Sequence, residues 1–200
     1  MLNLAIGTLL ASNPATKLTE EQYLALERAA ESRSEFVDGE MLAMSGGSMR
    51  HAQLQRNIVS ALDAALVDTD CEVFTSDFRV RVSERMYTYP DVSVVCGDAI
   101  LADGGQDTLV NPIVIFEVLS PSTEPYDRGL KFQYYRTVPS LNEYILVDPN
   151  RIRVEQYVRG EADTWVLRDY QRVEEDLGLH SISVSLSIGR IYRRVKFPTE

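Results

Sequence analysis

Three stretches of the chain carry apolar residues at helical spacing. Residues 20–30 follow Thr19, a residue type that caps helices, and they place acidic side chains in the first turn, which predicts a helix. Residues 50–67 and 127–138 each repeat apolar side chains every three or four positions, so each predicts a helix with one face toward the core. His51 lies near the start of the second helix on its apolar face, and we expect it to point inward.

Shorter runs predict strands. Residues 35–44 surround an Asp-Gly pair and predict a hairpin, and residues 152–158 and 165–170 predict an added C-terminal hairpin. Residues 113–119 are apolar on both faces, which is typical of a central strand covered on both sides. The other predicted strands are residues 89–96, residues 143–147 and residues 71–82, where Asp77, Arg79 and Arg81 alternate with apolar residues. This order predicts an α/β (α+β) fold with helices flanking a mixed central sheet.

Length and composition favour one domain. The chain has 200 residues, of which 44% are hydrophobic and 25% are charged, enough for a sizeable core. We assign residues 18–200 to a single domain and residues 1–17 to an N-terminal extension that we expect to be mobile. No apolar run is long enough to cross a membrane, and the first basic residue, Lys17, follows the apolar start instead of preceding it as in a secretory signal. We therefore expect a cytoplasmic protein with no membrane partner.

The charge balance limits how the protein can meet nucleic acids. Thirty acidic residues against 20 basic ones give a net charge of −10. Coating nucleic acid by charge alone needs a positive field, so this class of protein is excluded. A local basic groove stays open, although such charge runs are also typical of solvated faces. Its candidate residues are Arg79, Arg81 and Arg85 on one segment and Arg128, Lys131 and Arg136 on another.

Cysteine usage and the absence of nucleotide motifs narrow the chemistry. Cys71 and Cys96 are too few for a disulfide framework, and a reducing compartment is the simpler interpretation. No Cys/His pairing suits structural zinc. The chain has neither a Gly-x-Gly-x-x-Gly turn nor a phosphate-binding loop, so a nucleotide cofactor is not expected.

Glu117 is the most informative residue because it lies inside the apolar strand predicted at residues 113–119. An ionised carboxylate there is costly unless a cation meets it, and that cation is either an Arg or Lys side chain or a metal ion. Asp91 opens another strand, where it either lies in solvent or converges with Glu117 on one hard cation. Lys131 lies on the core-facing stripe of the helix at residues 127–138. Its amine either reaches solvent or returns to the carboxylates, where it could hold a water or stabilise charge on a phosphate oxygen.

A set of motifs runs through the chain around these residues. They are Glu35-Phe36-Val37-Asp38-Gly39-Glu40, the later His51, Tyr89-Pro90-Asp91-Val92, Phe116-Glu117-Val118-Leu119-Ser120-Pro121-Ser122-Thr123, then Asp127, Lys131 and Tyr134-Tyr135, and Glu143-Tyr144-Ile145-Leu146-Val147-Asp148-Pro149. Together they resemble the Uma-two family of putative restriction endonucleases, which is similar to the PD-(D/E)-x-K nuclease superfamily. The resemblance covers nearly the whole chain from about Leu18 onward.

The resemblance implies a restriction-endonuclease-like fold with four core strands and a divalent cation, Mg²⁺ or Mn²⁺, at one sheet edge. Asp91 and Glu117 match the two metal-binding acids, and Val118 is expected as a third metal-binding position. The chain departs from the superfamily two residues after Glu117, where Leu119 replaces a lysine. Lys131 is then the candidate replacement, donated from the next helix.

These expectations describe a metal-dependent DNA endonuclease that hydrolyses phosphodiester bonds. Asp91, Glu117, Lys131 and His51 are its candidate catalytic residues. His51 lines the entrance or contacts a phosphate in this interpretation, whereas a hydrogen-bonded core histidine is the competing one. We expect a homodimer, since two active sites are needed to cut both strands. The alternative is a catalytically inert nuclease-fold module with a binding or structural role, which Leu119 and the net charge both favour.

Overall fold

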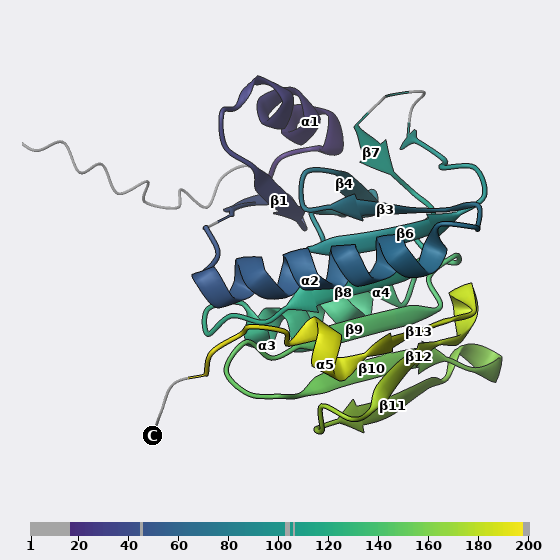
Figure 1. Ribbon diagram of the computed structural model, residues 1–200. Helices are drawn as coiled ribbons and strands as arrows, with labels where there is room; N and C mark the ends of the chain where they lie inside the picture. The colour runs from purple at the N-terminus through teal and green to yellow at the C-terminus, as the bar shows by residue number, and fades with distance from the viewer. Residues whose placement is uncertain (1–16, 45, 103–104, 106, 198–200) are drawn as a thin grey trace, which may run out of the picture.

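A six-stranded mixed sheet forms the centre of the computed structural model, which describes residues 17–44, 46–102, 105 and 107–197 (Figure 1). Its strand order is β11-β10-β9-β8-β6-β3, and its strands are β3 (Cys71–Thr75), β6 (Val92–Cys96), β8 (Val114–Val118), β9 (Glu143–Val147), β10 (Val154–Arg159) and β11 (Trp165–Tyr170). β8 pairs antiparallel with β6 and parallel with β9. This mixed sheet, flanked by helices, confirms the predicted fold class, although it has six strands instead of four.

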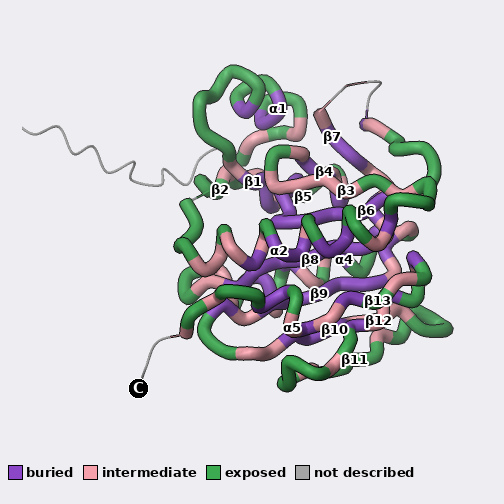
Figure 2. The backbone as a smooth tube through the Cα atoms, viewed as in Figure 1, coloured by how far each residue is buried: buried purple, intermediate pink, exposed green. Residues whose placement is uncertain are grey.

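Two apolar layers sandwich the central sheet. Helix α2 (Met49–Leu66) covers one face of the sheet (Figure 1). There Leu54, Ile58 and Leu62 belong to one apolar cluster with sheet valines and Phe116. The opposite face packs against the segment that contains α4 (Phe132–Tyr135), and Tyr135 lies in that second cluster. Since β8 is covered on both sides, all of its residues are buried, as its continuous apolar pattern predicts (Figure 2).

A second, five-stranded sheet lies beside the first and contains the N-terminal hairpin. Its strands, in the order β2-β1-β5-β4-β7, are β2 (Glu40–Ala43), β1 (Ser34–Val37), β5 (Met86–Thr88), β4 (Arg79–Ser83) and β7 (Thr108–Leu109). The β1–β2 pair confirms the predicted hairpin, with positive φ at Asp38 and Gly39, which an Asp-Gly turn accommodates. Helix α1 (Glu20–Ala29) has Thr19 as its N-cap, as predicted, and Thr19 forms a capping box with Gln22.

The single strand predicted over residues 71–82 is wrong. A turn, closed by the Phe78 N–H donating to the Thr75 carbonyl, separates β3 from β4, and the two strands belong to different sheets. Arg79 is buried instead of facing solvent, and it pairs with Asp107. Apolar and polar residues alternate with the same period before and after this tight turn, so the sequence pattern did not reveal that β3 and β4 are separate strands.

The C-terminal part of the chain completes the sheet and covers α2. β10 and β11 form the predicted hairpin. The remaining elements are β12 (Asp176–Leu179), β13 (Val184–Ser187), α5 (Ile188–Ile191) and the 3₁₀ turns Glu161–Asp163 and His180–Ile182. None of the described helices is both long and apolar enough to span a membrane. The predicted extension at residues 1–17 lies outside the described residues except for Lys17, so its assignment stays a prediction. The cytoplasmic location also stays a prediction.

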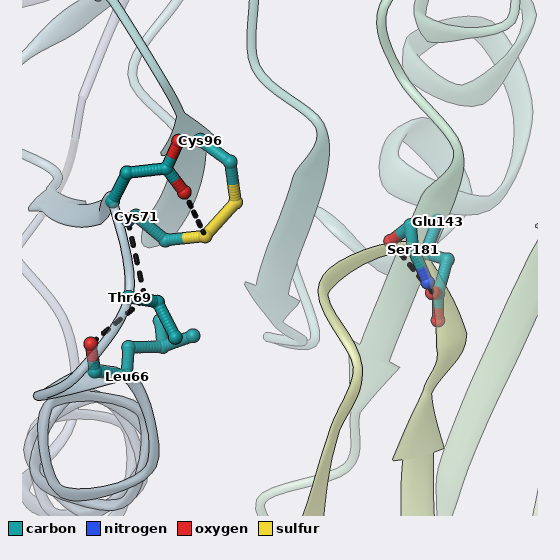
Figure 3. Close-up of a disulfide and its surroundings, with 7 residues drawn as sticks. Leu66, Thr69, Cys71, Cys96, Glu143 and Ser181 are labelled. Atoms are coloured by element: carbon teal, nitrogen blue, oxygen red, sulfur yellow. Dashed lines mark hydrogen bonds between the residues drawn. A yellow bond between two sulfur atoms is a disulfide. The ribbon is translucent and has the colours of Figure 1, made fainter.

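A disulfide joins Cys71 on β3 to Cys96 on β6, where the two residues face each other in the antiparallel register (Figure 3). Disulfides persist in oxidising environments, so the cysteine count no longer supports a reducing compartment. The disulfide also prevents the two sulfurs, which lie beside Asp70, from acting as thiolate metal ligands.

We expect reduction of this disulfide to lower the free energy of unfolding by about 3.5 kcal/mol, because it closes a loop with a sequence separation of 25 residues. Urea unfolding with and without a thiol reductant measures the difference. The Cys71→Ser/Cys96→Ser variant serves as the control and should not respond to the reductant. Equal unfolding midpoints for the wild type under both conditions would contradict the expectation.

Candidate active site

The strand register brings Asp91 and Glu117 together. Val92 pairs with Phe116 in the antiparallel β6–β8 ladder, so the next position outward sets Asp91 opposite Glu117 on the same face. The Asp91 N–H lies 3.4 Å from Glu117 Oε2, and the Val118 N–H donates to Asp91 Oδ2 at 2.7 Å. The two carboxylates and the Val118 backbone therefore form one polar group at the end of the central sheet.

Lys131 reaches this group from the opposite layer. Its Nζ lies 2.8 Å from Glu117 Oε1, 2.9 Å from Glu35 Oε1 and 3.6 Å from Asp127 Oδ1. Lys131 is only 5% exposed, so the alternative in which its amine reaches solvent is wrong. Leu119, where the resemblance leads one to expect a lysine, is buried in the apolar cluster against α4.

A π-helical segment explains how Lys131 is delivered. The predicted continuous helix over residues 127–138 is instead a composite of α3 (Glu124–Tyr126), a π-helical turn at Asp127–Lys131 and α4. Both ends of the π-helical turn, Asp127 and Lys131, are buried. Wider turns of this kind occur mostly as single turns within α-helices, frequently at functional sites, and periodicity in the sequence does not predict them.

Three residues of the cluster received no site role from the sequence. Glu35 on β1 contacts Lys131 and accepts a hydrogen bond from the Thr88 hydroxyl, and Asp127 lies beside Lys131. The Tyr135 hydroxyl donates to Glu117 Oε1 at 3.0 Å. The sequence could have indicated a site role for Glu35, because this acidic residue precedes the apolar Phe36 and Val37 and begins the first motif that resembles the family.

The cluster has more negative than positive charge. Burial raises the pKa of Glu117 to about 8, and Asp127, Asp91 and Glu35 add to the rise while Lys131 opposes it. Burial also raises the pKa of Asp127. For Lys131, burial opposes the charged amine, but Glu117 and Glu35 outweigh it and hold its pKa well above the usual value. Glu35, Glu117 and Asp127 share the Lys131 ammonium, and Asp91 contacts His51. The four carboxylates outnumber these cationic side chains, and such a donor set suits a hard divalent cation.

His51 meets the cluster from the α2 side. Its backbone N–H donates to the hydroxyl of Ser48, the N-cap of α2, and its ring Nε2 lies 2.8 Å from Asp91 Oδ1. Burial lowers its pKa, but the hydrogen bond and charge of Asp91 outweigh burial and raise it. The side chain is only 20% exposed, so it points inward as expected, and it lines a cleft beside Asp91.

This cleft, of about 700 Å³, gives access to the cluster. Its walls come from the end of β2, the first turn of α2, the loop after β8 and the loop after β9; they include Met44, Arg50, His51, Ser120, Ser122 and Asn150, with Asp91, Glu117 and Lys131 also lining it. The structure does not support the basic groove considered above. Arg79, Arg81, Arg85 and Arg128 pair with Asp107, Glu20, Asp38 and both Glu124 and Glu155.

The arrangement defines an α+β protein of the nuclease fold, with a carboxylate–lysine cluster at the end of its central sheet. The structure is similar to a crystal structure described as a putative nuclease belonging to DUF820 from Anabaena variabilis. The TM-score is 0.72 at 20% sequence identity, and the match covers 88% of this chain and 97% of that chain. At this identity the likeness establishes the fold.

Sequence comparisons then identify the family. Residues 20–189 match the Uma2 model, described as "Putative restriction endonuclease", and the chain belongs to this family. Two uncharacterized proteins of Synechocystis sp. are similar to it. The first, slr1290, is 35% identical over 93% of this chain and 97% of its own length. The second, sll1609, is 38% identical over 76% of this chain and 86% of its own length. The resemblance in the motifs is thus confirmed.

We expect Glu117→Gln to stabilise the metal-free protein at pH 8 and to lose this advantage as the pH falls toward 5. The raised pKa of Glu117 means that the folded protein holds a proton that the unfolded chain releases above about pH 4.5. Wild-type stability therefore falls as the pH rises from about 4.5 to 8, by up to about 1.4 kcal/mol per unit of pKa difference. Glutamine does not titrate.

Urea unfolding with a chelator, from pH 5 to 8.5, measures this effect. The exposed Glu72→Gln on β3 is the matched control, and its stability difference from the wild type should not vary with pH. A Glu117→Gln protein that is much less stable than the wild type at every pH would show that the carboxylate is a structural ion-pair member.

Lys131→Met should have the opposite effect on stability. It keeps the apolar stem but leaves Glu35, Glu117 and Asp127 without their shared ammonium, which typically costs about 3–5 kcal/mol. Urea unfolding at pH 7 measures the loss, with the exposed Lys196→Met as control. A loss below about 0.5 kcal/mol, the range of ordinary surface substitutions, would mean that the ion pairs contribute little.

Proposed function

We propose that this protein is a metal-dependent DNA endonuclease that hydrolyses phosphodiester bonds. The observation that carries the proposal is the buried cluster in which Lys131 meets Glu117 beside Asp91, at the floor of an open cleft. Membership of a family described as restriction endonucleases supports it. Clusters of buried carboxylates with a lysine are costly to maintain for stability alone, which favours a functional role.

The proposed cofactor is Mg²⁺ or Mn²⁺, held by Asp91 and Glu117 with Val118 as a third position. The excess of carboxylates over cationic side chains fits a divalent ion, and Mg²⁺ usually keeps several waters in addition to one or two carboxylates. When bound, such an ion makes a coordinated water more acidic and withdraws charge from a phosphoryl oxygen.

The protein's own side chains then have distinct roles. Lys131 would orient the attacking water or neutralise charge that develops on the phosphate. Glu35 and Asp127 would keep the Lys131 amine charged and fixed beside Glu117, at the distances given above. His51 would hold Asp91 in place through its 2.8 Å contact and line the entrance for the substrate.

A catalytically inert nuclease-fold module is the competing function. Leu119 favours it, because the position that carries a lysine in the superfamily is occupied by a buried apolar side chain. The active-enzyme proposal requires that Lys131 takes over that role from the π-helical turn. It also includes a homodimer, since a single cluster can cut only one strand at a time.

Plasmid nicking in Mg²⁺ and in Mn²⁺ tests the proposed activity. We expect the wild type to nick supercoiled DNA, Asp91→Asn to abolish nicking, and Lys131→Met to slow it by about 10²–10³-fold through loss of charge stabilisation. The exposed Asp70→Asn, purified identically, should nick like the wild type. Nicking that survives in Asp91→Asn would indicate a contaminating nuclease, and a folded wild type without nicking in either metal would favour the inert module.

A further inference from the structure

The cleft contains a second polar region outside the carboxylate cluster. Arg50, in the first turn of α2, lines it together with Asn150, whose Oδ1 accepts a hydrogen bond from Arg50 Nη2 at 2.9 Å. The Arg50 Nε is buried and has no hydrogen-bond partner among the described residues. Part of this guanidinium therefore has donor capacity that the described chain does not use.

Arg50 differs from the other basic side chains that line the cleft. Lys131 is neutralised by Glu117 and Glu35, and His51 contacts Asp91. Arg50 has no carboxylate within ion-pair distance in the part of the chain that the structure describes. A guanidinium presents a planar fork of donors that matches phosphate oxygens, and it is always charged.

Hydroxyl groups lie in the same cleft, on the loop after β8. Ser120 Oγ lies 3.0 Å from Ser122 Oγ and 2.9 Å from Thr123 Oγ1, and all three residues line the cleft with Arg50. Serine and threonine hydroxyls, with arginine, make many of the phosphate contacts in protein–DNA complexes. His51 follows Arg50 directly in the chain and reaches Asp91, so this region adjoins the carboxylate cluster.

We propose that Arg50 binds a backbone phosphate of the DNA strand adjacent to the phosphate that is cut, and that the hydroxyls of the 120–123 loop support this subsite. The inference rests on the proposed function and specifies how the polyanionic substrate is held. A protein with a net charge of −10 and four carboxylates in its site repels DNA at long range. A cation without a carboxylate partner beside the cluster supplies the local attraction that keeps the strand in place.

The salt dependence of DNA binding tests this subsite. Binding of a 20-base-pair duplex is measured over a range of KCl concentrations in the Glu117→Gln background, so that the DNA is not cut. Loss of one phosphate contact lowers the slope of log K against log[KCl] by about 0.9. Arg50→Ala should show this drop and bind roughly tenfold more weakly at 100 mM KCl, whereas Arg50→Lys should keep the slope, since it keeps the charge.

Arg56→Ala is the matched control. Arg56 lies on the same helix, lines a different surface groove, and donates to the side chain of Asn57 rather than to a carboxylate. It should leave both slope and affinity unchanged. If Arg50→Ala does not fold, Arg50→Gln removes the charge while keeping a donor for Asn150.

Three results would overturn the subsite. If Arg50→Ala does not change the salt slope of DNA binding while the wild type nicks plasmid DNA, the subsite is disproved and the proposed function stands. If the Glu117→Gln protein does not bind the duplex and the wild type does not nick plasmid DNA, both the proposed function and the subsite are disproved. A slope that falls equally in Arg56→Ala would show only a general effect of charge, and would also count against the subsite.

Discussion

The contact between the Lys131 amine and the Glu117 carboxyl group is the interaction around which the end of the central sheet is arranged. Glu117 lies in β8, which is buried on both faces, so its carboxylate needs a cation that can reach it without water. The chain supplies one ammonium and surrounds it with Glu35 and Asp127 as well. The result is a group of three acids that repel one another around a single ammonium, so the negative groups outnumber the positive one.

The sequence reveals those parts of the site that depend on local pattern. An acid inside an apolar run identifies Glu117, and a strand start identifies Asp91; their pairing then follows once β6 and β8 are neighbours. Other features depend on tertiary register, which no period in the sequence encodes. The division between β3 and β4, the disulfide of Cys71 with Cys96, and the burial of Arg79 are all of this kind.

An acidic protein can bind DNA, its proposed polyanionic substrate, only where positive side chains attract the DNA locally. Most arginines considered for a basic groove are engaged with carboxylates and stabilise contacts between loops and strands. Such pairs carry no net positive charge, so they contribute little to attracting a polyanion. Positive charge at the cleft is therefore concentrated at few points. Such an arrangement would favour a DNA strand bound in one orientation and would disfavour non-specific binding along the protein surface.

The chain has Leu119, not a lysine, two residues after Glu117, yet an amine still reaches Glu117 from another element. A strand position two residues after Glu117 points to the same face, and Leu119 does pack on the α4 side of the sheet. Lys131 enters from that same side, through the π-helical turn, and its Nζ arrives 2.8 Å from Glu117 Oε1. The ammonium beside Glu117 therefore comes from the helical segment and not from the strand. The extra width of the π-helical turn is then a structural solution for bringing a helix-borne lysine to a strand-borne acid.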